Sequence, residues 1–168
     1  MSILPSGVGV SHAQDRRRLL WVGKTTFDLV LDASQTQGSI ALLDQWGEQG
    51  DVTPMHIHHG EAEIFYVLQG SILAWAGDER VSLASGGAVY LPPDQPHAFG
   101  VTSPTARLIS VTAPAGFAGF VQAAGIPVNG EVPATWEFDM GALMSAAADH
   151  DIDIVGPPPA LPESLFGS

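Results

Sequence analysis

Short apolar segments recur along most of this 168-residue chain, and glycine, proline, serine or aspartate residues stand between them. Segments of this length and spacing are typical of strands in a β-sandwich or β-barrel. The pattern therefore predicts an all-β fold. The expected strands are Leu19–Val22, Thr25–Leu31, Ser39–Trp46, Glu61–Gln69, Ile72–Ala76, Arg80–Leu83, Ala88–Leu91, His97–Thr102 and Arg107–Thr112.

One stretch within this pattern carries side chains suited to binding a metal. His56 and His58 are two residues apart, so in a strand they project from the same face. Gly60 permits a tight reversal, and Glu63 then opens a strand that runs back beside the first. Two imidazoles and a carboxylate would converge, a set that suits a divalent transition metal. His97, beyond a second glycine-bounded strand, could complete the site.

The alternative is that these residues are ordinary surface groups, because strand histidines and acidic residues near turns are commonly solvated. A carboxylate at the start of the strongly apolar strand that follows Glu63 would, however, need a partner once buried. Cysteine is absent, so nitrogen and oxygen must provide the ligands. We expect one divalent ion, Fe, Mn, Ni, Co, Cu or Zn. Its identity stays open because affinity rises toward copper whatever the function.

Two motifs resemble those of the cupin family. The first consists of Gly50, five residues, His56-Ile57-His58, four residues, Glu63, six residues and Gly70. The second lies within residues 86–101 and consists of Gly86, five residues and Pro92, followed by His97. It departs from the family pattern at two positions, with Asp94 in place of the usual glycine and Val101 in place of the usual asparagine.

The resemblance covers about residues 35–113 and implies a small jelly-roll β-barrel with the metal inside. The implied ligands are His56, His58, Glu63 and His97. Alternation along the strands points further side chains toward the same interior, where we expect them to line a substrate pocket. These are Phe65, Val67, Phe99 and Val101.

We expect residues 1–168 to form one cupin domain with additions at both ends of the barrel. Met1–Asp15 has the character of a loosely held arm, and residues 114–168 form a helical extension. Helices are predicted over Phe117–Ala124 and Met140–Ala148, the second capped by Asp139, with Leu143 and Met144 facing inward. Both helices could pack on the outside of the barrel, or the first could be a lid over the pocket mouth.

Two segments after the barrel, Ala113–Phe117 and Ile154–Pro159, resemble single-barrel cupins of the quercetin 2,3-dioxygenase type. That resemblance implies a metal-dependent dioxygenase that cleaves a flavonol such as quercetin, or a related aromatic or enolic oxygen chelator, with dioxygen. Glu63 is the expected catalytic base, because a carboxylate ligand can swing away and take the substrate's hydroxyl proton. The alternatives are a non-oxidative cupin enzyme (isomerase, decarboxylase or lyase) and a metal-dependent binding protein. The apolar lining favours the dioxygenase over a sugar isomerase.

The remaining polar and aromatic residues are expected outside the site. His59 alternates away from the ligands, and Glu61 sits in the turn, where solvent or a salt bridge is the default. Tyr66 and Tyr90 face away, and His12 and His150 lie at the surface. The tryptophans are expected in the core or an interface: Trp21, Trp46, Trp75 and Trp136.

Charge and hydropathy limit the kinds of partner and the location that we expect for this protein. The net charge is −12, from 18 acidic and 6 basic residues, which speaks against nucleic acid. No apolar run approaches the ~20 residues of a membrane-spanning helix. Met1–Val10 lacks the basic start of a secretory signal, so we expect a cytoplasmic protein. Leu19–Val22 would be an apolar edge strand, which needs covering, and this predicts a homodimer.

Overall fold

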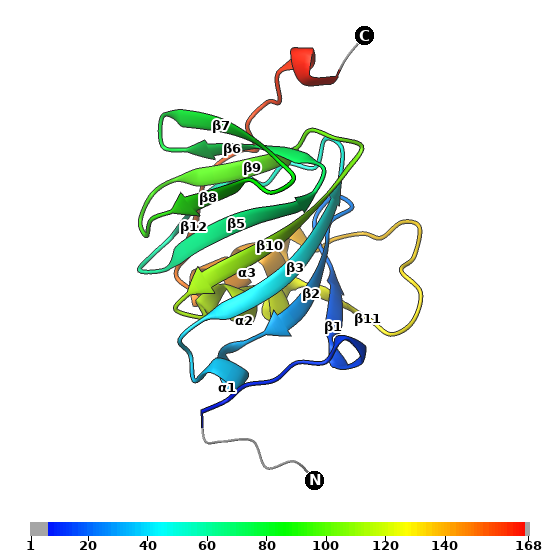
Figure 1. Ribbon diagram of the computed structural model, residues 1–168, viewed down its shortest axis with the longest axis vertical. Helices are drawn as coiled ribbons and strands as arrows, with labels where there is room; N and C mark the ends of the chain where they lie inside the picture. The colour runs from blue at the N-terminus through cyan, green and yellow to red at the C-terminus, as the bar shows by residue number, and fades with distance from the viewer. Residues whose placement is uncertain (1–6, 167–168) are drawn as a thin grey trace.

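The computed structural model describes residues 7–166, so the first six residues of the expected N-terminal arm lie outside the described residues. Its strands form two antiparallel sheets that wrap into a jelly-roll barrel (Figure 1). The larger sheet has the order β11-β1-β2-β3-β10-β5-β8, and the smaller has the order β12-β4-β9-β6-β7. The predicted all-β class is therefore confirmed.

The strands are β1 (Arg17–Leu20), β2 (Thr26–Leu31), β3 (Ala41–Glu48), β4 (Met55–His58), β5 (Ala62–Gln69), β6 (Ser71–Ala76), β7 (Glu79–Ala84), β8 (Ala88–Leu91), β9 (His97–Val101), β10 (Thr105–Ala113), β11 (Ile126–Val128) and β12 (Ile152–Gly156). The helices are α1 (Ala33–Thr36), α2 (Gly116–Ala124) and α3 (Met140–Asp149). Short 3₁₀ turns lie at η1 (Ala13–Asp15) and η2 (Glu163–Phe166).

Each expected strand is present with ends shifted by up to two residues, but two strands were not foreseen. β11 pairs with β1, and β12 pairs with β4 at the edge of the smaller sheet. The sheets thus begin before residue 35 and continue past residue 113. β12 has only five residues, too few for its alternating pattern to stand out in the sequence. In the structure, Ile152 lies opposite His58 and Ile154 lies opposite His56.

Two buried apolar clusters fill the space between the sheets. The barrel cluster joins side chains of the middle strands: Phe65, Val67, Ile72, Ala74, Leu91, Phe99, Val101, Ala106 and Leu108. The helix cluster joins the first three strands to α2 and α3 and includes Trp21, Phe27, Leu43, Phe117, Phe120 and Leu143. The four predicted metal ligands lie among the buried residues of the same interior.

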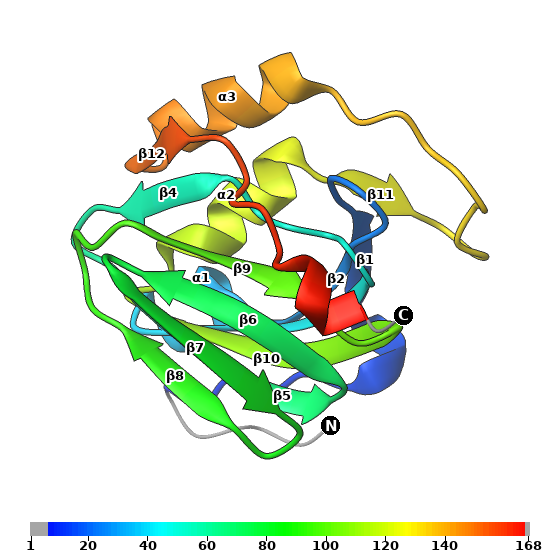
Figure 2. The ribbon, with the colours of Figure 1, turned by 90° about the horizontal axis from the view of Figure 1, so that it is seen from above.

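Both predicted helices exist. α2 lies against the sheets at one side of the barrel, and α3 covers α2 on the outside (Figure 2). Asp139 caps α3 as expected, because its carboxylate accepts the N–H groups of Gly141 and Ala142 at 2.8 and 3.0 Å. Leu143 is buried, but the inward orientation expected for Met144 is wrong, since that side chain is 49% exposed. α3 meets α2 along a narrow stripe that Met144 does not reach.

The reason given for a homodimer also fails. β1 is hydrogen-bonded on both sides, by β2 and β11, so it is not an edge strand. Leu19, Leu20 and Trp21 are buried within the chain itself. The homodimer stays a prediction without that argument, and a light-scattering mass near 17.6 kDa would contradict it. Among the described residues, no helix is long and apolar enough to span a membrane.

Candidate metal centre

Strand geometry brings the four proposed ligands together. His56 and His58 alternate with outward-facing residues along β4, and both are buried. Gly60, at φ +71°, makes the reversal into β5, where Glu63 is 2% exposed. His97 on β9 lies directly opposite His56 in the register. One ligand atom from each of these four side chains lies within 4.8 Å of the others.

The four residues, hereafter the ligand cluster, come from both sheets. His56, His58 and His97 belong to the smaller sheet, and Glu63 belongs to the larger. The Glu63 Oε2 atom lies 3.2 Å from His97 Nε2 and 3.7 Å from His58 Nε2. An ion about 2.1 Å from each ligand needs ligand atoms roughly 3–4 Å apart, which these separations satisfy. A shared ion here would join the two sheets.

Hydrogen bonds at the far side of each ring fix which nitrogen faces the centre. The Nδ1 atom of His56 donates to the Pro54 carbonyl at 2.8 Å, and that of His97 donates to the Gln95 carbonyl at 2.9 Å. The Nδ1 atom of His58 donates to a Glu61 carboxylate oxygen at 2.9 Å. Because these acceptors cannot donate, Nδ1 carries the proton in all three rings. The Nε2 lone pairs are left for a ligand.

The buried atoms at the centre fit a metal ion. His58 Nε2 and Glu63 Oε1 are fully buried and have no hydrogen-bond partner among the described residues. A buried polar atom without a partner carries a desolvation cost of about 1–3 kcal/mol, more for a charged group. A divalent cation removes that cost for both atoms, because each presents a lone pair. Three imidazoles and a carboxylate thus suit a divalent transition metal.

Protons compete with a metal at these ligands. Burial, followed by the nearby His97 and His58 rings, holds the pKa of His56 well below 6.5. Burial also lowers the pKa of His97, but the hydrogen bond and charge of Glu63 outweigh it, and the net pKa of His97 is raised. Without metal, the contact with Glu63 therefore favours a proton on His97 Nε2 more than the environment of His56 favours one there. Metal binding at Nε2 must compete with such a proton.

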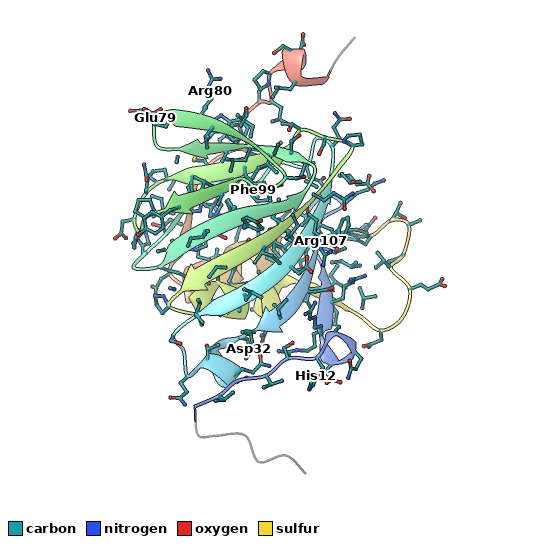
Figure 3. The ribbon with its side chains drawn as sticks, in the orientation of Figure 1. His12, Asp32, Glu79, Arg80, Phe99 and Arg107 are labelled. Carbon is teal, nitrogen blue, oxygen red and sulfur yellow. The ribbon has the colours of Figure 1, made fainter. Side chains whose placement is uncertain are left out.

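A cavity of about 50 Å³ opens beside the ligand cluster and is walled mainly by aromatic and aliphatic side chains. Phe65 and Phe99 line it, as expected (Figure 3 labels Phe99). Val67 and Val101 do not line the cavity. Both are fully buried in the barrel cluster, so their side chains share the inward face without reaching the open side.

The other cavity walls were not foreseen as pocket residues. Trp21 lines the cavity, although the expected place for the tryptophans was the core or an interface. From α2, Phe117 and Phe120 also face the cavity, so this helix is part of the wall and does not pack on the outside of the barrel. Gln45 adds a polar group from β3. Only the fold shows what the buried face of α2 meets.

Glu61 contacts the ligand cluster and does not lie in solvent, so of its two expected environments the structure favours the contact with a charged or polar partner. It is 7% exposed, and one oxygen accepts the Nδ1 proton of His58. The other oxygen accepts the backbone N–H of Phe117 at 3.0 Å. A usable signal was its position three residues after His58, across the turn.

His59, Tyr66 and Tyr90 lie outside the ligand cluster. His59 points away from the cluster, and its ring bonds Asp94 and Asp153 at 3.0 and 2.8 Å, which raises its pKa. Asp94 has a φ of +64°, which explains why glycine is usual at that motif position. Tyr66 and Tyr90 are exposed.

The two histidines outside the motifs differ from each other. His12 is exposed, as expected. His150 is half-buried, and its Nδ1 bonds the Ala146 carbonyl at 2.8 Å.

Comparison with known proteins agrees with the barrel and the cluster. Residues 47–112 match the family model of the cupin domain. Quercetin 2,3-dioxygenase of Bacillus subtilis is 26% identical over 130 residues, which are 77% of this chain and 36% of that protein. An uncharacterized protein of Methanocaldococcus jannaschii is 35% identical over 48 residues, 29% of this chain and 38% of that protein. The chain thus spans little more than a third of these curated relatives.

Solved structures share the fold at lower identity. KdgF from a Halomonas species superposes with a TM-score of 0.57 at 18% identity, over 63% of this chain and 94% of that one. A variant of Bacillus subtilis oxalate decarboxylase gives a TM-score of 0.59 at 20% identity, over 69% of this chain and 32% of that one. Fold and site together define a double-sheet barrel with an interior metal-binding cluster. The match over residues 47–112 agrees with the cupin domain that the two motifs predicted.

Proposed function

We propose that this protein is a metal-dependent dioxygenase that acts on a flavonol or a related aromatic or enolic oxygen chelator. The observation that carries the proposal is the ligand cluster at one side of a cavity walled by aromatic rings. The relative named quercetin 2,3-dioxygenase supports it, since the similarity extends over 77% of this chain.

His56, His58, Glu63 and His97 would hold the ion, with each imidazole presented through Nε2. When bound, a divalent ion supplies a Lewis-acid centre that favours an anionic substrate oxygen and leaves positions for small ligands. The carbonyls of Pro54 and Gln95 hold two of the rings in the binding tautomer.

Glu63 is the proposed base. Its Oε2 atom is engaged by His97, whereas Oε1 is buried with no partner among the described residues. With one Glu63 oxygen toward the ion, the other would be the atom that takes a hydroxyl proton from a substrate in the cavity. The aromatic walls would hold a planar ring by face and edge contacts and would keep bulk water from the ionised substrate.

The test is oxygen consumption with quercetin by protein loaded in turn with each candidate divalent metal. Dioxygen uptake equal to quercetin loss, with both atoms of ¹⁸O₂ in the products, is the expected result. His59→Ala is a suitable control, because it removes a neighbouring histidine that lies outside the cluster. Substrate turnover without dioxygen uptake would instead indicate a non-oxidative enzyme. Tight binding without turnover would indicate a binding protein.

A further inference from the structure

Helix α2 differs from the other two helices in how its first turn is capped. α1 and α3 each begin after an aspartate whose side chain accepts their own N–H groups. The residue before α2 is Ala115, which has no side chain able to do this. The first N–H groups of a helix need acceptors, and a helix without a cap is less stable.

Glu61 supplies the missing cap from 56 residues away in the sequence. Its Oε2 atom accepts the Phe117 N–H at 3.0 Å, inside the first turn of α2. A negative charge at this end also interacts favourably with the helix dipole. The same carboxylate bonds His58 through Oε1 at 2.9 Å. Both of its oxygens are thus used, one by a wall of the cavity and one by a proposed ligand.

The two elements also touch directly. The ring of Phe117 packs against the ring of His58, with centroids 5.1 Å apart. Phe117 lines the cavity, so α2, the cavity wall and His58 form one packed unit around the Glu61 carboxylate. We propose that Glu61 is a positioning residue that couples occupancy of the metal site to the placement of α2. This inference rests on the proposed metal site.

Glutamine is not a neutral replacement at this position. Two donors, the His58 Nδ1–H and the Phe117 N–H, meet two carboxylate oxygens, whereas an amide offers one oxygen. If that oxygen faces Phe117, the amide nitrogen meets His58 and moves the ring proton to Nε2, the atom aimed at the metal. If it faces His58, the first N–H of the helix meets a donor. Either arrangement breaks one side of the coupling.

A second variant disturbs the carboxylate without changing it. A Cβ added at Gly116 would lie 2.8 Å from Glu61 Oε2, so Gly116→Ala must displace that oxygen. Gly119→Ala is the matched control, because it makes the same change in the same helix. There the added Cβ meets only the His150 ring, at 3.0 Å. The pair keeps the proposal testable even if Glu61→Gln does not fold.

The experiment measures Zn²⁺ binding to the full chain together with two NMR readouts, the ¹⁵N shifts of the His58 ring and hydrogen exchange of the Phe117 amide. In the natural protein, we expect Zn²⁺ at one per chain, a proton on Nδ1, and slower exchange of the amide with Zn²⁺ bound. Glu61→Gln should lower the affinity for Zn²⁺ by about 10- to 100-fold, and Zn²⁺ should no longer slow hydrogen exchange of the Phe117 amide. Gly116→Ala should also lower the affinity for Zn²⁺, whereas Gly119→Ala should leave it unchanged.

Two results would overturn the inference in distinguishable ways. Failure of the natural protein to bind Zn²⁺ would remove the metal site and the inference with it. Normal Zn²⁺ binding by both Glu61→Gln and Gly116→Ala, with the His58 proton still on Nδ1, would leave the site intact and remove the role of Glu61.

Discussion

The barrel carries two groups of four polar residues, one on the outer face of its larger sheet and one in the interior between the two sheets. The two groups differ in how their charges are paired. On the outer face, the Arg18 guanidinium donates two hydrogen bonds to the Asp28 carboxylate, at 2.6 and 2.7 Å. The Arg107 guanidinium donates two to the Asp44 carboxylate, at 2.9 and 2.5 Å (Arg107 is labelled in Figure 3). These residues form the outer ion pairs. On the inner side, the ligand cluster has three imidazoles and one carboxylate. His58 Nε2 and Glu63 Oε1 have no hydrogen-bond partner within residues 7–166.

The difference shows how structural charges can be told from functional ones. Asp28 and Asp44 face each other across β2 and β3, a repulsive arrangement, yet each accepts both arms of an arginine fork. The two carboxylates of the outer ion pairs are therefore neutralised by arginine and require no bound cation. The ligand cluster has two buried acceptor atoms with no donor in the described part of the chain, so a cation suits it. The predictions below test this contrast, from the largest expected effect to the smallest.

Replacing His56 and His58 together by alanine should abolish stoichiometric metal, because half of the ligand cluster is lost. Elemental analysis of purified protein should show a fall from one divalent ion per chain to none. His59→Ala should keep its metal. If the double variant still carries one ion per chain, the site lies elsewhere.

Glu63→Gln separates ligation from base catalysis. With metal restored, the variant should remain slower by about 10²- to 10⁴-fold, because an amide cannot take the substrate proton. A substrate already ionised at alkaline pH should partly rescue the rate. Steady-state rates across a pH series provide the measurement. Full activity at neutral pH in the metal-replete variant would leave Glu63 as a ligand alone.

Asp44→Asn should affect stability and leave the metal unchanged. Asp44 is buried beneath the Arg107 guanidinium, and loss of its charge weakens two charge-assisted hydrogen bonds. We expect the free energy of unfolding to fall by about 1.5–3 kcal/mol. Urea unfolding and metal analysis on the same samples provide the test. Metal loss from a folded variant would show that the two groups are not independent.

The smallest expected effect concerns Asp32, whose carboxylate is paired near the surface with Arg17 and Ser34. The Ser34 hydroxyl lowers its pKa below 3.8, with further help from the Ser34 N–H, Gln122 and Arg17, while partial burial opposes the shift. A carboxyl with a lowered folded-state pKa adds stability above its unfolded pKa, and this is lost as pH falls through the folded value.

Asp32→Asn should therefore cost at most about 1 kcal/mol near neutral pH, and the difference should shrink below pH 3.8. Urea midpoints across a pH series measure this. A difference that is independent of pH would mean that the charge of Asp32 contributes nothing.

The sequence by itself predicted the barrel and the ligand cluster, because both depend on local rules. Alternation with a period of two puts His56 and His58 on one face, and Gly60 reverses the chain so that Glu63 returns beside them. The motif spacing then added His97. The same periodicity correctly buried Phe65 and Phe99 but could not tell how far along the barrel each side chain lies. Val67 and Val101 were therefore wrongly placed in the cavity.

Only the tertiary structure decided what surrounds the cluster. Trp21 and Phe117 reach the cavity from segments far apart in the sequence, and β12, near the C-terminal side, pairs with β4. Glu61 has an ordinary turn position in the sequence, yet it meets a helix that begins 55 residues later. Such contacts depend on how the sheets and helices pack, and residue spacing carries no record of that packing. The local pattern therefore predicted the proposed ligands, and the packing determined their hydrogen-bond partners and the walls of the cavity.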